Sequence, residues 1–358
     1  MKIYGVSVSY FTGKLEAYLR YKRIAYEMES PYGRARELKS VFGAIQVPMV
    51  LRDDGRAMSD TTPILQQLER EHPTPAVIPN DPVVRFLSLL IEDYADEWLW
   101  RPAMHYRWSY EHDRALLSRI LADEVAPHLK VPRWMKLRRL AKRQREGFVV
   151  RDGVTEETRE HVEASYRTAL ANMTTMLAAR PYLLGGTPSL ADFGMMGPML
   201  RHFGQDPTPA EIMRNEAPAV WRWVARVWDA QAEQADLLDD IPDDAAPMLR
   251  ECCETHLVQL AANAAAHAEG KTHFGMEVQG CRYRRLPVSR YRVWCLEQLR
   301  DHFAALDAQA RSAVQKQLAF TGADVLWTDA VPASSGYDPK GEAPFNAAIN
   351  VFGDGVPS

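Results

Sequence analysis

Hydrophobic and polar positions over the first 80 residues predict a compact unit that mixes strands and helices. Leu15, Tyr18 and Leu19 fall on one helical face at i, i+3, i+4 spacing, and Asp54-Gly55 marks a hairpin turn between two short apolar runs. The pattern predicts strands at residues 2–8, 26–28, 48–52 and 56–58 and helices at residues 13–22 and 61–71. We expect the order β-α-β-(α)-β-β-α over residues 1–80, a domain of the α/β class.

A proline-rich stretch at residues 72–82 closes this unit, because four prolines in eleven residues forbid a helix and deprive a sheet of donors. Beyond it, apolar residues recur three and four positions apart, which predicts an all-α second domain over residues 83–235. Its helices are expected at residues 82–107, 112–124, 155–178 and 189–202.

The chain continues for more than a hundred residues beyond this point, which predicts a C-terminal extension over residues 236–358. The pattern predicts helices at residues 246–268, 289–306 and 308–320 and an extended piece at residues 273–285. Residues 330–358 are rich in Pro, Gly, Ser and Asp and lack periodicity, so we expect them to be irregular.

Composition narrows the class of function. The formal net charge is −4, with 43 basic and 47 acidic residues, which argues against a nucleic-acid partner. Eight Lys or Arg residues in the segment 131–151 are interpreted as a solvated helix face rather than a membrane-binding or nucleic-acid-binding element. No apolar stretch is long enough to span a membrane and no signal segment is recognised, so a cytoplasmic protein is expected. The four cysteines lack CxxC spacing, and no metal site is predicted.

Two segments of the first domain suit the binding of a peptide-like ligand. Val47-Pro48 places a proline at the mouth of a strand, and such a proline, when cis, exposes the preceding backbone for pairing with an extended peptide. Asp60 and Thr61 precede a helix, where amide donors and a carboxylate match an α-amino acid group. Each segment also suits a structural role, as an edge-strand proline or a helix cap.

A third segment offers hydroxyl groups between the first strand and the first helix. Ser9, Tyr10 and Thr12 lie in this loop. A hydroxyl at a helix N-terminus can donate a hydrogen bond to a ligand thiolate and lower the thiol pKa from about 8.5 toward neutrality. The same loop could serve only as a strand-to-helix cap.

These segments, in this order, resemble the glutathione-binding domain of glutathione transferases. The resemblance is carried by residues 9–12, by Val47-Pro48 and by Asp60-Thr61-Thr62-Pro63-Ile64. In the second domain, residues 185–193 resemble the family segment in which Ser189 and Asp192 form a capping box at the start of the central helix. The resemblance implies a thioredoxin-like first domain, an all-α second domain, glutathione as co-substrate and a homodimer. The extension has no counterpart in the family pattern.

The resemblance also implies a set of site residues. Val47 and Pro48 would hold the cysteinyl part of glutathione, Asp60 and Thr61 its γ-glutamyl end, and Gln46, Arg34 and Arg36 its glycyl carboxylate. Ser9 falls where serine-type members keep the activating hydroxyl, with Thr12 and Tyr10 as reserves. Because Thr12 falls where other classes place a cysteine, a mechanism through a mixed disulfide is disfavoured.

The function expected from this resemblance is activation of the glutathione thiol as a thiolate that attacks an apolar electrophile. The electrophile pocket is expected between the domains, near Tyr10 and Phe11 and the aromatic residues of segment 82–107, which are Tyr94, Trp98, Trp100, His105 and Tyr106. Two alternatives stay open: a glutathione-dependent lyase or etherase, and a non-catalytic relative that uses the fold for binding or assembly.

Overall fold

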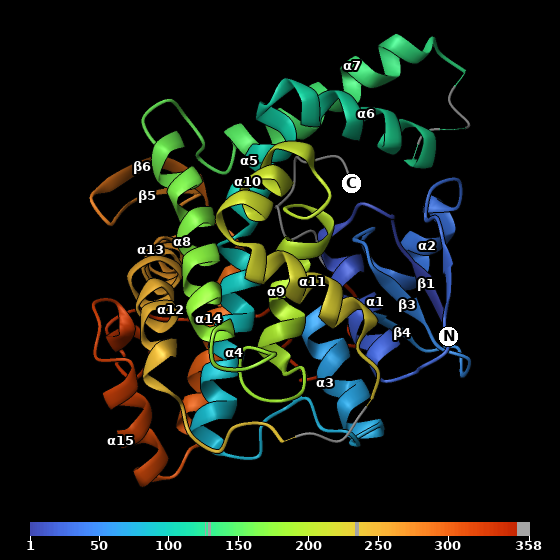
Figure 1. The fold of residues 1–358 in the computed structure, drawn as a ribbon. Helices are drawn as coiled ribbons and strands as arrows, with labels where there is room; N and C mark the ends of the chain where they lie inside the picture. The colour runs from blue at the N-terminus through green and yellow to red at the C-terminus, as the bar shows by residue number, and fades with distance from the viewer. Residues whose placement is uncertain (126, 128–129, 233–235, 349–358) are drawn as a thin grey trace.

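A four-stranded sheet forms the centre of the N-terminal part (Figure 1). The structure is a computed structural model that describes residues 1–125, 127, 130–232 and 236–348. The strand order is β2-β1-β3-β4, with β1 (Lys2–Tyr4) parallel to β2 (Glu27–Glu29) and antiparallel to β3 (Met49–Leu51). β4 (Ala57–Ser59) pairs antiparallel with β3. Ile3 and Val50 lie opposite each other and are fully buried, so the sheet has an apolar centre.

Three helices pack around this sheet: α1 (Tyr10–Tyr21), α2 (Ala35–Phe42) and α3 (Thr61–Glu71). The first strand ends earlier than predicted, because the chain leaves the sheet after Tyr4 and turns through Ser9, the N-cap of α1. Helix α1 therefore begins earlier than its apolar spacing indicated. Leu15 and Leu19 of α1 are fully buried, as the helical spacing predicted. The expected mixed α/β unit is confirmed.

The following part is helical, as predicted. It contains α4 (Pro82–Glu97), α5 (Trp100–Ser109), α6 (Glu111–Val125), α7 (Arg133–Gln144), a π-helical turn at 145–150, α8 (Arg159–Leu177), α9 (Leu190–Arg201), α10 (Pro207–Glu216) and α11 (Pro218–Asp229). The predicted helix 82–107 is divided into α4 and α5, because Pro102 has no N–H to donate to the carbonyl of Trp98. Helices α10 and α11 were not predicted. In Figure 1, α6 and α7 extend from the body of the molecule as an arm.

Helix α9 crosses the middle of the molecule and packs against α1 and α4. It begins with the predicted capping box, in which Asp192 accepts hydrogen bonds from the backbone N–H of Ser189 at 2.9 Å and from its hydroxyl at 2.7 Å. Asp192 also accepts from the indole of Trp223 at 2.9 Å. These contacts hold the start of α9 inside the apolar core.

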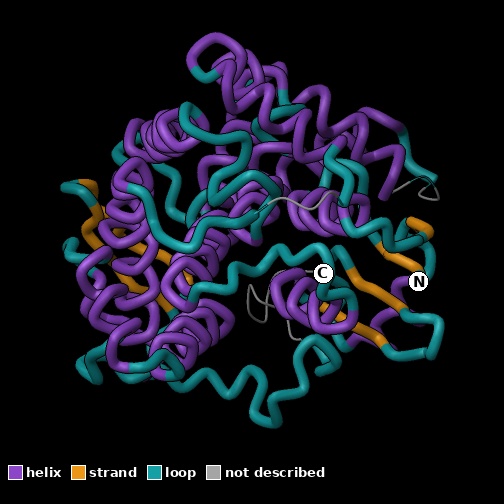
Figure 2. The backbone as a smooth tube through the Cα atoms, turned by 60° about the horizontal axis from the view of Figure 1, so that its bottom comes forward, coloured by secondary structure: helices purple, strands orange, loops and turns teal. Residues whose placement is uncertain are grey.

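The C-terminal extension is mainly helical and packs on the second domain. It contains α12 (Ala246–Glu251), a π-helical turn at 252–257, α13 (Val258–Ala268), β5 (His273–Val278), β6 (Cys281–Pro287), α14 (Arg290–Ala304) and α15 (Ala308–Gln317). The piece expected to be extended is a β5–β6 hairpin, whose turn residues Gln279 and Gly280 both have positive φ. Figure 2 shows this hairpin on the opposite side of the molecule from the four-stranded sheet.

Residues 330–348 follow these elements without a helix or strand, as expected. They return to the N-terminal part, where the backbone N–H of Ser59 donates to the carbonyl of Pro344 at 3.0 Å and that of Ala348 donates to Phe42 at 2.8 Å. The rest of the expected irregular tail, residues 349–358, lies outside the described residues. Among the described helices, none is long and apolar enough to cross a membrane.

Candidate functional site

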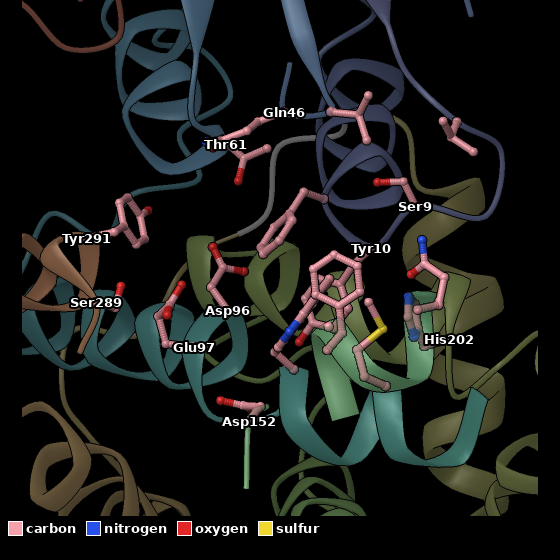
Figure 3. Close-up of a pocket in the computed structure, with 18 of the residues that line it drawn as sticks. Ser9, Tyr10, Gln46, Thr61, Asp96, Glu97, Asp152, His202, Ser289 and Tyr291 are labelled. Atoms are coloured by element: carbon pink, nitrogen blue, oxygen red, sulfur yellow. The ribbon is translucent and has the colours of Figure 1, made fainter. Parts of the chain in front are cut away.

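A cavity of about 320 Å³ lies where the three parts of the chain meet. The N-terminal part contributes the loop after β1, the segment before β3 and the start of α3. The helical part contributes the end of α4, α5 and the π-helical turn after α7, and the extension contributes the start of α14. Figure 3 shows Thr61 and Tyr291 on one side of this pocket and Ser9 and His202 on the other. Its volume is in the range of small-molecule sites.

Ser9 lines the cavity at the N-terminus of α1. Its hydroxyl oxygen accepts a hydrogen bond from the backbone N–H of Thr12 at 3.3 Å, which is the usual N-cap contact. A hydroxyl that accepts through its oxygen still has its proton to donate. The helix dipole of α1 adds partial positive charge at the same place. Ser9 therefore has a hydroxyl proton that it can donate to a group in the cavity.

The two reserve residues are placed differently. Tyr10 lines the cavity, but its side chain is buried and its hydroxyl donates to the carbonyl of Ala95 on α4. Burial raises the pKa of Tyr10 well above its ordinary value, so the phenol stays protonated. Thr12 is fully buried and is not among the residues that line the cavity, and its hydroxyl has no partner among the described residues. The hydroxyl protons of Tyr10 and Thr12 are therefore less available to a group in the cavity than that of Ser9.

Gln46, Val47 and Pro48 line the cavity beside β3. The Val47–Pro48 peptide is cis, as expected for a proline at this position. Thr61 lines the same cavity at the first position of α3. Together with Ser9, Tyr10 and Asp60, these residues bring seven of the ten site residues implied by the resemblance to one cavity.

Asp60 lies at the N-cap of α3, but its carboxylate does not cap that helix. Its φ angle of 73° lies in the left-handed region, which Asp tolerates better than most residues. Its Oδ1 accepts a hydrogen bond from the hydroxyl of Tyr291 at 3.1 Å, whereas Oδ2 is buried without a partner among the described residues. Burial raises the pKa of Asp60 to about 7, although the bond from Tyr291 and the charge of Lys14 lower it.

Of the three residues expected to bind the glycyl carboxylate, only one lines the cavity. Gln46 lines the cavity, whereas Arg34 and Arg36 do not. The Arg34 guanidinium pairs with Glu37 at 2.7 Å and with Glu29 at 3.0 Å on the surface. Arg36 is exposed.

Two basic residues of the segment 131–151 line the cavity: Arg143 of α7 and Arg151, which follows the π-helical turn. The sequence interpretation assigned the whole basic segment to a solvated face, so it missed them. The only signal for them was the number of basic residues between 131 and 151, and that number does not show which of them face inward.

Acidic residues at the end of α4 face the cavity beside α14 (Figure 3). Asp96 pairs with the buried Lys14, which also pairs with Glu92, and burial raises the pKa of Asp96 well above its ordinary value. Glu97 accepts from Arg292 of α14 at 3.0 Å. Neither carboxylate had been predicted, since a helical spacing does not reveal which acidic residues turn inward.

The aromatic residues expected around the pocket are distributed between the cavity and the core. Phe11 and Trp100 line the cavity with their rings stacked at a centroid distance of 5.7 Å, and Trp108 of α5 lines it too. The other four aromatic candidates are buried and do not line it: Tyr94, Trp98, His105 and Tyr106. His202, which was not predicted, lines the cavity, and burial lowers its pKa well below the ordinary value, so it is neutral.

No group of three His, Cys, Asp or Glu residues within the described ranges is arranged to hold a metal ion. The four cysteines are free thiols, of which Cys252, Cys253 and Cys295 are buried and Cys281 is half-buried. The polar groups that line the cavity include hydroxyls, carboxyls, guanidinium groups, the side-chain amide of Gln46 and the neutral imidazole of His202.

Two domain models match this sequence. The glutathione S-transferase N-terminal domain matches residues 3–76, and the glutathione S-transferase C-terminal domain matches residues 156–226. Residues after 226 lie outside both matches. A search of curated proteins found no match.

Similar solved structures are distant in sequence. A glutathione S-transferase from Rhodospirillum rubrum F11 is 18% identical, with 69% of this chain and 91% of that chain covered and a TM-score of 0.42. The beta-etherase LigF from Sphingobium sp. strain SYK-6 is 19% identical, with 63% and 93% covered and a TM-score of 0.45. A glutathione S-transferase from Methylobacterium radiotolerans JCM 2831, in complex with glutathione sulfonate, is 19% identical, with 67% and 99% covered and a TM-score of 0.39.

Proposed function

We propose that this chain, which belongs to the glutathione S-transferase family, binds glutathione in the cavity and activates its thiol as a thiolate for attack on an electrophile. The observation that carries the proposal is the position of Ser9, whose hydroxyl lines the same cavity as Val47, Asp60 and Thr61. In this assignment Ser9 is the catalytic residue of a serine-type member, and glutathione is the co-substrate.

Each end of glutathione has a complementary group in the cavity. The backbone of Val47 would pair with the cysteinyl residue, and Thr61 at the start of α3 would hold the γ-glutamyl carboxylate through its amide. Asp60 would accept from the γ-glutamyl ammonium. Gln46 is the residue on this side of the cavity that suits the glycyl carboxylate.

The reaction begins with loss of the thiol proton to solvent. The Ser9 hydroxyl then donates to the thiolate sulfur, and the dipole of α1 adds stabilisation. The sulfur forms a bond to an electrophilic carbon, and a leaving group departs with the electron pair of the broken bond. Phe11, Trp100 and Trp108 offer an apolar surface for that substrate. A lyase or etherase would use the same first step with an ether oxygen as leaving group.

Titration calorimetry with glutathione, combined with ultraviolet difference absorbance of the thiolate, tests this proposal. We expect the thiol pKa of bound glutathione to lie below about 8.5 in the wild type and to return toward that value in Ser9→Ala. Ser9→Gly is the matched variant, because glycine at an N-cap costs only a few tenths of a kcal/mol whereas alanine costs about 1 kcal/mol. A thiolate signal that persists in Ser9→Gly would exclude Ser9 as the activating residue.

Other outcomes identify the alternatives. Glutathione binding without thiolate formation would indicate a non-catalytic member that uses the cavity for binding. Absence of any binding heat would contradict the proposal altogether. The expected homodimer and the cytoplasmic location also remain proposals, and sedimentation equilibrium of the full chain tests the first of them.

A further inference from the structure

We propose that the C-terminal extension completes the glutathione site, with Tyr291 as the positioning residue that holds the Asp60 carboxylate for the γ-glutamyl ammonium. This inference rests on the proposed function and gives the extension a role in that same site. Its central observation is the hydrogen bond from the Tyr291 hydroxyl to Asp60 Oδ1 at 3.1 Å, across a separation of 231 residues.

Among the residues that the structure describes, no other group donates a hydrogen bond to the side chain of Asp60. A buried carboxylate without donors tends to take up a proton and then no longer attracts an ammonium group. The hydroxyl of Tyr291 counteracts this tendency, since a hydrogen bond to the charged form favours ionisation. A carboxylate oxygen has more than one lone pair, so Oδ1 can accept from Tyr291 and from a ligand together.

The start of α14 is fixed firmly enough to position Tyr291. Asn263 of α13 forms two hydrogen bonds with the backbone of Ser289, the N-cap of α14, at 2.7 Å and 2.8 Å. Arg292 follows Tyr291 and pairs with Glu97 at 3.0 Å and with Asp152 at 3.4 Å. These bonds join α14 to α13, to α4 and to the segment after the arm, so Tyr291 has little freedom to move.

Aromatic contacts hold the ring of Tyr291 from the side. Its centroid lies 5.5 Å from that of Trp294 and 5.4 Å from that of Tyr337, and Tyr337 also lines the cavity. The extension therefore supplies a wall on the side of Asp60, where it excludes water and strengthens any charge interaction. Figure 3 shows Tyr291 directed toward the pocket on the same side as Thr61.

The groups that shift the pKa of Asp60 lie on three elements. Lys14 of α1 lowers its pKa, whereas Glu92 and Glu97 of α4 raise it, and the Tyr291 hydroxyl of α14 lowers it. With a pKa of about 7, Asp60 loses its proton as pH rises through neutrality, so glutathione binding should strengthen over that range. Removal of the Tyr291 hydroxyl should move the midpoint of this increase to higher pH.

The test is calorimetric binding of glutathione to the full-length wild type, to Tyr291→Phe and to Tyr283→Phe over a range of pH. Tyr283 of β6 is the control, because its hydroxyl bonds to His161 of α8 at 2.8 Å and it does not line the cavity. We expect about tenfold weaker binding and a raised pH midpoint in Tyr291→Phe alone.

A second ligand separates a role at the ammonium from a general loss of structure. Glutaryl-cysteinyl-glycine has the shape of glutathione without the ammonium group, so the wild type should bind it more weakly than glutathione. Tyr291→Phe should reduce that preference, and Tyr283→Phe should keep it. Equal glutathione affinity and an equal pH midpoint in wild type and Tyr291→Phe would overturn the inference and leave the proposed function intact. A wild type that does not bind glutathione would overturn both.

Discussion

The guanidinium of Arg107 on α5 forms a bidentate ion pair with the carboxylate of Asp206, with Nε–Oδ2 at 2.7 Å and Nη2–Oδ1 at 2.9 Å. Both side chains are buried. The third nitrogen of Arg107 donates to the carbonyl of Val8 at 2.7 Å, next to Ser9. This arrangement ties the loop that carries the Ser9 hydroxyl to the helical part of the chain.

Replacement of Asp206 should leave a buried guanidinium without its counter-charge. We expect Asp206→Asn to lower the free energy of unfolding by about 3–5 kcal/mol, as is usual when one partner of a buried pair is removed. Asp244→Asn is the control, since Arg180 and Asp244 form a similar bidentate ion pair that is partly exposed. Because this pair keeps some contact with water, the loss should be smaller than in Asp206→Asn. Urea denaturation measures both, and equal losses would contradict this explanation.

Thr12 provides a test of the hydroxyl assignment. Its buried hydroxyl has no described partner, so Thr12→Val removes an unsatisfied polar group and keeps the shape of the side chain. We expect stability to stay the same or to rise by about 1 kcal/mol, with thiolate formation unchanged. Thermal unfolding and ultraviolet difference absorbance measure these quantities. Loss of the thiolate signal in a folded Thr12→Val protein would transfer the activating role from Ser9 to Thr12.

Lys14 forms ion pairs with two buried carboxyl groups, those of Glu92 and Asp96. We expect Lys14→Met to lower the free energy of unfolding by about 3–5 kcal/mol at neutral pH. Loss of the lysine charge would raise the pKa of Asp96 further, so the folded variant would bind a proton more tightly than the unfolded chain. Its stability deficit should therefore shrink as pH falls.

Denaturation of the wild type and of Lys14→Met over a range of pH tests whether the loss of stability becomes smaller as pH falls. Lys2→Met is the matched control, because Lys2 pairs with Glu29 at 2.7 Å on the surface. Its cost should be within about 1 kcal/mol. A deficit in Lys14→Met that is independent of pH would show that lost packing, rather than charge, causes it.

Replacement of Asp60 should raise the stability of the fold above neutral pH and abolish glutathione binding. Burial raises its pKa from 3.8 to about 7, so the neutral form stabilises the fold at low pH and that contribution is lost as pH rises toward 7. We therefore expect Asp60→Asn to be more stable than the wild type above neutrality, on the order of 2 kcal/mol, with a difference that shrinks in acid. The same variant should lose glutathione binding. Melting curves at several pH values decide this, and a variant that is less stable above neutrality would contradict it.

The sequence predicted those features that depend on local pattern. The apolar face of Leu15 and Leu19, the hairpin turn at Asp54-Gly55 and the Ser189–Asp192 capping box follow from spacing and from turn or cap chemistry, and the structure contains all three. The break between α4 and α5 was missed, because a helical period continues through positions 98–102 while a single proline removes one hydrogen bond.

The part of the site that the sequence did not reveal depends on distant contacts. Tyr291 meets Asp60, and Arg292 meets Glu97, only because the extension folds back over the end of α4. No local pattern encodes such a meeting, and the family pattern has no counterpart for these residues. The orientation of the Thr12 hydroxyl into the interior is likewise set by the packing of α1 rather than by its place in the loop.

One continuous cluster of buried apolar residues runs from Ile3 of β1 to Leu326 after α15, and Tyr4, Leu38, Phe42 and Met49 form a second, small cluster beside the sheet. Phe86 of α4, for example, meets Phe303 of α14 at a centroid distance of 5.8 Å. The extension is therefore not a detachable module on a linker. A protein shortened to the length of ordinary relatives would expose the face of α4 that α14 and α15 cover and would tend to aggregate. Gain or loss of this segment in evolution would require matching changes on α4, so we expect the two to change together among relatives.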